Sequence, residues 1–159
     1  MFPYSLSSLQ KGKMKMNEDE DEDELILHVA IRFAEGIDKD NMGANADQRT
    51  YQVFGRGRPD MEFHTQVVNG MPDPTWKRTF HMWMRDPWMW THLHLEVVRT
   101  GSKSDPGSSS GTVLVGRAQI PLPTEIGIAI GGKYNLVRHV EPISVVGCIC
   151  VAMEITKKE

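Results

Sequence analysis

The chain has 159 residues, 40% of them hydrophobic, which is enough for one globular domain with a packed core. Its formal net charge is −3, but a third of its acidic residues fall in the run Asn17–Glu24, so the remainder is mildly basic. Such a balance suits anionic lipid headgroups or acidic proteins and is too weak to predict nucleic-acid binding.

Residues 1–24 combine a start containing Ser and Lys with the acidic run and offer little to bury. Runs of like charge stay solvated, so we expect a disordered tail here and one domain over residues 25–159. The start lacks the apolar stretch of a signal peptide, and no later run approaches the roughly 20 apolar residues that span a bilayer. We therefore expect a cytoplasmic protein that reaches the plasma membrane peripherally.

From Leu25 onward, short apolar alternations are separated by Gly, Pro, Asp and Asn, a pattern typical of an all-β domain. The pattern predicts eight strands, at Leu25–Phe33, Thr50–Arg56, Glu62–Val68, Lys77–Met84, Leu93–Arg99, Thr112–Leu122, Lys133–Val137 and Val145–Ile155.

Two apolar runs, Val113–Gly116 and Val145–Val151, predict strands that are buried on both faces or lie near a sheet centre. Turn-forming residues predict exposed loops at Gly36–Asp47, Gly70–Pro74 and Gly101–Gly111, and the longest helical stretch would be a turn at Pro123–Ile130. Cys148 and Cys150 would point to the same side of their strand, which favours buried thiols over a disulfide.

Five motifs follow one another in a distinctive order. They are the strand Leu27–Phe33 ending in Ala34-Glu35-Gly36-Ile37; the stretch Asn41–Asp47; Thr65 with Asp73-Pro74-Thr75-Trp76 and Phe80; the series Val115–Leu122 after the strand Leu93–Val98; and Tyr134-Asn135-Leu136 with the closing strand Gly147–Ile155. From Leu25 to its end the chain therefore resembles a C2 domain, and among C2 proteins the small single-domain ones of plants, which are linked to calcium and defence signalling. The resemblance implies an eight-stranded antiparallel β-sandwich of the permuted type II topology.

The resemblance also places calcium ligands in the first and third loops, where C2 domains that bind several ions bring about five aspartates together. In the first loop Asn41 takes the place of the first aspartate, or Asp40 if the loop shifts by one, and Asp47 takes the second. In the third loop Arg99 and Gly101 occupy the aspartate positions, and Asp105 is the one acid that remains. Since calcium requires six to eight oxygens, these residues predict at most one weakly bound ion.

Arg99 replaces a calcium ion with a fixed positive charge, and Lys103 lies on the same loop. Together they predict binding of lipid phosphate with weak or absent calcium dependence. The alternative is that Arg99 pairs with Asp47 or Asp105 and ties the loops together without a ligand. Met42, near the tip of the first loop, could insert shallowly into a bilayer.

A second basic set consists of Arg49, Arg56, Arg58, Lys77 and Arg78, and it could bind lipid on a sheet face if Arg56 or Arg58 lies beside Lys77 on neighbouring strands. The alternative for this set is an ordinary solvated surface. The segment His81–Trp90 holds three of the four tryptophans, and its alternating members should enter the core. Trp88 and Met89, beside the Asp86-Pro87 turn, are candidates for a protein interface or for core packing.

Motifs for catalysis are lacking. His92 and His94 share one strand face without the further ligands of a zinc site, and neither Cys148 nor Ser108–Ser110 belongs to a nucleophile motif. We therefore expect a monomeric, non-enzymatic module that binds anionic phospholipid with weak, single-ion calcium dependence. The alternative is a calcium-independent module that binds and regulates a partner protein.

Overall fold

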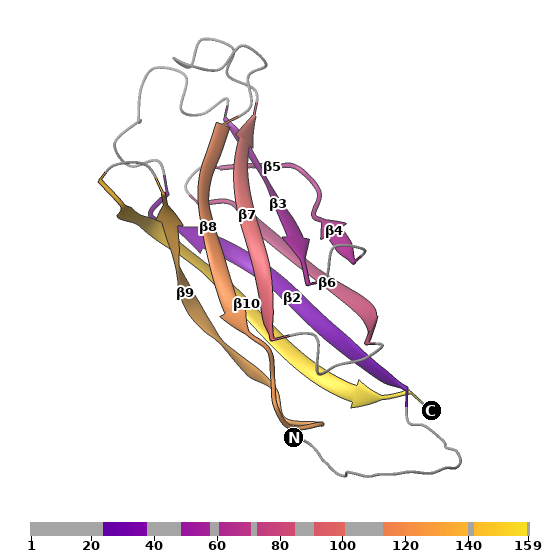
Figure 1. Cartoon of the computed structure of the whole chain (residues 1–159). Coiled ribbons are helices and arrows are strands. Elements are labelled where there is room, and N and C mark those ends of the chain that lie inside the picture. The colour runs from indigo at the N-terminus through magenta and orange to yellow at the C-terminus, as the bar shows by residue number, and fades with distance from the viewer. Residues whose placement is uncertain are drawn as a thin grey trace.

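The computed structural model describes residues 24–37, 49–57, 61–70, 73–84, 91–100, 113–139 and 142–158. Within these ranges every regular element is a β-strand (Figure 1). The strands are β2 (Leu25–Glu35), β3 (Thr50–Arg56), β4 (Glu62–His64), β5 (Val68–Asn69), β6 (Thr75–Met84), β7 (His92–Thr100), β8 (Val113–Pro121), β9 (Ile130–Arg138) and β10 (Ser144–Lys157). The predicted all-β class is confirmed, with the third predicted strand divided into β4 and β5.

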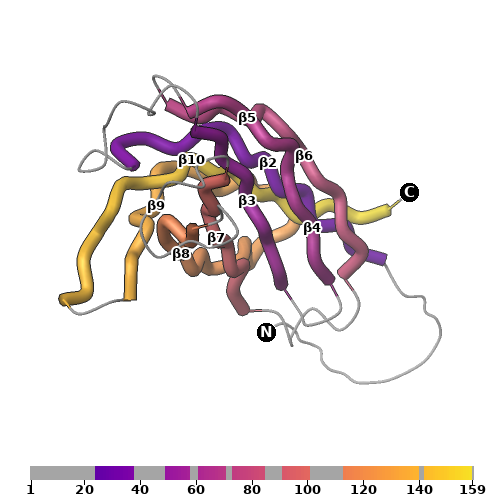
Figure 2. The backbone as a smooth tube through the Cα atoms, turned by 90° about the horizontal axis from the view of Figure 1, so that it is seen from above, coloured from indigo at the N-terminus to yellow at the C-terminus, as the bar shows by residue number. Residues whose placement is uncertain are grey.

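The strands are joined in the order β4-β3-β7-β8-β9-β10-β2-β6, with β5 paired to β3. The first four form one layer and the last four the other, as the view from above shows (Figure 2). A single register pair, Arg117 with Val137, connects the layers between β8 and β9. β2 lies between β10 and β6 in one layer, and the strand that follows it in the chain, β3, lies in the other layer. This arrangement agrees with the permuted topology expected from the sequence.

The antiparallel register fixes which connections share an end of the sandwich. β10 runs along β2 from Cys148 opposite Glu35 to Lys157 opposite Leu25. The start of β10 therefore lies beside the end of β2, while the C-terminal residues return to the beginning of β2. We call the end at which the chain leaves β2 and β7 and enters β3, β8 and β10 the loop end; it is uppermost in Figure 1.

Alternation produces the core because successive strand residues face opposite sides. In β2, Leu27, Val29 and Ile31 are fully buried. Side chains that are fully or almost fully buried also come from β7, at Leu93, Leu95 and Val97, and from β10, at Ile149, Val151 and Met153. Each such side chain contributes about 1.5–3 kcal/mol of transfer free energy relative to full exposure.

The far edge of the sandwich, between β4 and β6, is closed by side chains. Phe63 and Phe80 stack with ring centroids 4.5 Å apart. Gln66 Nε2 donates to the Trp76 carbonyl at 3.0 Å, and Trp76 Nε1 crosses the interior to donate to the Tyr51 carbonyl at 3.2 Å. Because these contacts join β6 to β3 and its neighbours, the two layers are held together along both edges.

Thr65 explains why one predicted strand becomes two. Its buried hydroxyl accepts a hydrogen bond from Val53 N at 3.0 Å and donates to Gln66 O at 2.9 Å. Its own N–H donates to Val53 O at 2.9 Å. The hydroxyl thus takes the place of a backbone group between β4 and β5, and the regular ladder is interrupted there.

Of the two alternatives predicted for the apolar runs, a place inside the strand order is found and burial on both faces is not. β8 and β10 do lie inside the strand order, but Leu114 is 38% exposed and Val145 is 60% exposed, so neither run is buried on both faces. The expected turn at Pro123–Ile130 is not helical; Ile126 instead forms a parallel bridge with Ile155. Across the described ranges, no helix is long and apolar enough to cross a membrane.

Candidate functional site

Most of the predicted site residues fall outside the described part of the chain. These are Asp40, Asn41, Met42, Asp47, Arg58, Trp88, Met89, Lys103 and Asp105. The structure places the remaining three, Arg56, Lys77 and Arg99.

Arg99 lies on the inner face of β7 at the loop end. It continues the series Leu93, Leu95, Val97, and its side chain is only 4% exposed. In register it faces Tyr51 of β3 on one side and Val113 of β8 on the other. The guanidinium is therefore enclosed at this end of the sandwich rather than presented on its surface.

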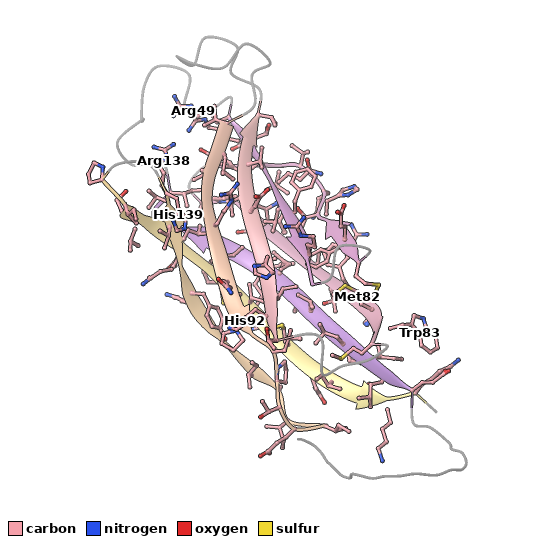
Figure 3. The ribbon with its side chains drawn as sticks, in the orientation of Figure 1. Arg49, Met82, Trp83, His92, Arg138 and His139 are labelled. Carbon is pink, nitrogen blue, oxygen red and sulfur yellow. The ribbon has the colours of Figure 1, made fainter. Side chains whose placement is uncertain are left out.

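Arg49 is a second buried arginine at this end, whereas the sequence analysis placed it in the basic set on a sheet face rather than at the loops. It precedes β3, is 8% exposed, and alternates with the half-buried Thr50 in the same pattern as the buried Tyr51 and Val53. Figure 3 shows it at the loop end. Both arginines have interaction partners within the protein. The spacing Arg49-x-Tyr51-x-Val53 was the sequence signal that could have placed it, because alternate residues share a face.

The strand ends that carry these arginines are fixed to each other. Thr50 and Thr100 face each other in register, and their hydroxyl oxygens are 2.7 Å apart. Thr50 Oγ1 also lies within 3.3 Å of the Thr100 carbonyl oxygen, to which it can donate. The bases of the first and third predicted loops are thereby held side by side.

Arginine remains charged at any pH a protein meets, so two positive charges persist at the loop end. Burying such charges costs several kcal/mol each unless partners compensate. A divalent cation placed nearby would be repelled by both. Among the residues that the structure describes, no group of three or more His, Cys, Asp or Glu side chains could hold a metal ion.

Arg56 and Lys77 do not come together. Arg56 lies on β3 opposite His94, near the start of β7 and away from the loop end. Lys77 lies on β6 in the other layer, where Thr75 pairs with Phe33 near the end of β2. The condition set for a joint lipid site of Arg56 and Lys77, neighbouring strands, is not met.

Arg56 instead lines a groove of about 1160 Å³ on the outer face of the first layer. Its positive charges are matched by negative ones: Arg117 Nε is 2.8 Å from Glu96 Oε2, and Arg56 faces Glu62 in register. The remaining polar lining includes His64, His94, Gln119, Asn135 and His139. The groove is therefore close to electrically neutral rather than a basic patch.

The cysteines are separate thiols, half-buried rather than buried. Cys148 Sγ is 3.8 Å from Glu35 Oε1, and Lys133 Nζ is 2.9 Å from the same oxygen. Burial raises the pKa of the Cys148 thiol, and the Glu35 carboxylate raises it further, whereas Lys133 lowers it. The hydrogen bond to Glu35 in turn raises the pKa of Lys133. Cys148 is accordingly held in the unreactive thiol form.

The predicted packing of the Trp-rich segment is confirmed where it is described. Met82 and Met84 enter the core, whereas Trp83 between them is 45% exposed and points away from the sheet (Figure 3). Lys158 Nζ lies 4.3 Å from the centroid of the Trp83 ring.

Solved structures with this architecture include a C2 domain of a plant extended synaptotagmin 1, with a TM-score of 0.54 and 16% identity, covering 87% of this chain and 99% of that one. The structure of the two C2 domains of extended synaptotagmin 2 with calcium bound gives a TM-score of 0.55 and 12% identity, and the match covers 84% of this chain and 42% of that one. The structure of CC2D1B is described as coordinating ESCRT-III activity during re-formation of the nuclear envelope. It gives a TM-score of 0.61 and 16% identity, and the match covers 87% of this chain and 57% of that one.

Human GIVD cytosolic phospholipase A2 gives a TM-score of 0.59 and 13% identity, covering 89% of this chain. The chain spans just over half the length of the CC2D1B chain and 17% of the phospholipase chain. No protein-family model matches the sequence, and the search of curated proteins found no relative. These likenesses establish the fold alone: the chain has the fold of C2 domains.

Proposed function

We propose that this chain is a non-enzymatic module that docks its loop end on anionic phospholipid at the cytoplasmic face of the plasma membrane, with weak calcium dependence. The observation that carries the proposal is the burial of Arg49 and Arg99 at that end. In a multi-ion calcium site, bound ions neutralise the clustered carboxylates before the loops can approach a negative membrane. Here the two arginines supply the neutralising charge permanently.

The charge balance of the loop end supports this proposal. Segments 36–49 and 99–112 together contain four acidic and four basic side chains, so their net charge is zero without any ion. The acids are Asp38, Asp40, Asp47 and Asp105, and the bases are Lys39, Arg49, Arg99 and Lys103. Without the arginines the same segments would repel an anionic surface.

Calcium has a minor part in the proposal. Asp40 or Asn41, Asp47 and Asp105 would supply the oxygens for at most one ion, and the arginine charges would weaken its binding. Met42 would add shallow insertion and Lys103 a headgroup contact.

The test is binding to vesicles of phosphatidylserine and phosphatidylcholine in the presence of a calcium chelator. Arg49→Gln and Arg99→Gln should each weaken binding by roughly fivefold, because a basic residue near an anionic surface contributes about 1 kcal/mol. Lys158→Gln, at the opposite end, is the matched control and should bind normally. Thermal unfolding of each variant verifies that the fold is retained.

Charge reversal gives a second readout. Arg99→Asp should weaken calcium-free binding and create a calcium response, because it places a carboxylate where calcium-binding C2 domains have one. Equal behaviour of Arg99→Asp and the wild type would show that Arg99 only ties the loops together. Failure of the wild type to bind these vesicles with or without calcium would remove the lipid proposal and favour the protein-interaction module.

A further inference from the structure

Two aliphatic side chains project into solvent at the loop end, and one of them belongs to a run that the sequence analysis assigned to the interior. Ile143 is 65% exposed and Val145 is 60% exposed. Val145 is the second residue of β10, and Ile143 directly precedes the strand, two positions before Val145. We call this pair the apolar ridge. A third aliphatic residue, Leu114, is 38% exposed at the start of β8, at the same end.

Register extends the apolar ridge across the sheet. Val145 lies directly opposite the half-buried Val137 of β9, and Ser144 lies opposite Arg138. Branched aliphatic side chains directly opposite each other on antiparallel strands form one continuous surface. The ridge is thus a patch of neighbouring apolar groups rather than isolated exposed residues.

The packing of two glycines fixes the ridge against the bases of both long loops. A Cβ on Gly147 would lie 2.6 Å from the Glu35 carbonyl oxygen and 2.9 Å from Ile37 Cγ2, so β10 presses directly on the end of β2. A Cβ on Gly116 would lie 2.8 Å from Val146 Cγ2, so the same segment also presses on β8. The ridge is therefore held rigidly beside the point where the first loop begins and the third loop ends.

Two basic residues, Arg138 and His139, stand at the end of β9 beside the start of β10. Arg138 is the last residue of β9 and pairs with Ser144, so its side chain leaves the face of the sheet opposite to that of Val145; His139 follows it at the loop end (Figure 3). Within 135–139 and 142–147 there is no carboxylate; Glu141, in the same turn, lies outside the described residues. Apolar side chains beside basic ones match the boundary between acyl chains and anionic headgroups.

We propose that the apolar ridge of Ile143 and Val145 is a membrane-contacting element that inserts into anionic bilayers alongside the loops. The inference rests on the proposed lipid docking and names a part of the surface that docks. A stable protein interface would need about 800 Å² per partner, far more than two or three side chains supply. Partial insertion of a few aliphatic groups, in contrast, adds usefully to a weak electrostatic contact.

The test compares two double variants on phosphatidylserine-containing vesicles. Ile143→Ser with Val145→Ser should weaken binding at least about tenfold, because two branched side chains no longer leave water. The loss should be similar at low and high salt, because an apolar contact is not screened. The control is Ile126→Ser with Ile128→Ser, which removes an equally spaced pair, 49% and 54% exposed, between β8 and β9 at the opposite end.

The outcomes separate the ridge from the function on which it rests. Normal binding of the ridge variant, with a wild type that binds, would overturn the ridge and leave the lipid docking intact. A wild type that does not bind these vesicles would overturn both. A ridge variant that binds vesicles normally but lowers self-association in analytical ultracentrifugation would assign the ridge to contact between copies of the chain, which also contradicts the proposal. Thermal unfolding of both double variants verifies their folding.

Discussion

Gly147 is the residue that allows β10 to begin where it does. Its φ of +126° is rarely adopted by residues with a side chain, and the place of a Cβ is filled by the Glu35 carbonyl oxygen at 2.6 Å. Both the backbone conformation and the close approach require glycine. The position of the apolar ridge therefore depends on this single residue.

Gly147→Ala should lower the free energy of unfolding by about 3 kcal/mol or more, the sum of backbone strain and a clash with an immovable carbonyl. Gly127→Ala is the matched control: its φ is +82°, but no atom lies within 4 Å of its Cβ position. It should cost only about 1–2 kcal/mol. Urea unfolding measures both, and equal losses would contradict the packing argument.

Cys148 offers a chemical probe of the Glu35 and Lys133 cluster. Because Glu35 raises the pKa of the thiol and Lys133 lowers it, the two neighbours should act in opposite directions on its reactivity. Glu35→Gln should lower the Cys148 pKa and speed alkylation in mildly alkaline solution severalfold. Lys133→Met should slow it.

The measurement is the alkylation rate against pH with Cys150→Ser in the background, so that one thiol reports. Rates that change in the same direction in both variants would show that access, rather than charge, controls the thiol.

At the level of elements, the strands were predictable because alternation is written directly into β2, β3, β7 and β10. The division into β4 and β5 was not, since it depends on the hydroxyl of Thr65 replacing a backbone group of a strand twelve residues away. The exposure of Val145 was also missed. An apolar run indicates burial, and nothing local to it shows that Val145 is 60% exposed.

The Thr65 hydroxyl can be tested by isosteric substitution. Thr65→Val keeps the shape but leaves the Val53 N–H without its acceptor, so the free energy of unfolding should fall by about 1–3 kcal/mol. Thr65→Ser keeps the hydroxyl and should cost less. Urea denaturation of both proteins decides the point, and a larger loss for the serine variant would show that the methyl group, not the hydroxyl, matters.

At the scale of the whole molecule, the sequence indicated the C2 architecture and located Arg99 at a strand end, but it did not place the side chain inside. The series Leu93, Leu95, Val97, Arg99 contains the signal, although a charge at the last position is more commonly solvated. The pairing of Arg56 with Lys77 could not be judged from sequence because it depends on which layer each strand joins. The neutral charge of the groove could not be predicted either. It depends on the register that places Glu62 beside Arg56 and Glu96 beside Arg117.

The surfaces of the molecule differ in charge and in exposed apolar groups. The groove on the first layer is charge-matched, β2 and β10 of the second layer contribute buried side chains to the core, and the loop end combines two buried arginines with exposed aliphatic groups. Under the proposed function, this is the end that docks on an anionic membrane, because Arg49, Arg99 and the apolar ridge are gathered there.

The most direct test of this account is the affinity of the wild-type chain for phosphatidylserine vesicles, titrated once with excess chelator and once with millimolar calcium. If the buried arginines replace the ions, the chain should bind in both conditions with affinities that agree within about threefold. Binding that appears only with calcium, and with a steep dependence on its concentration, would contradict the account.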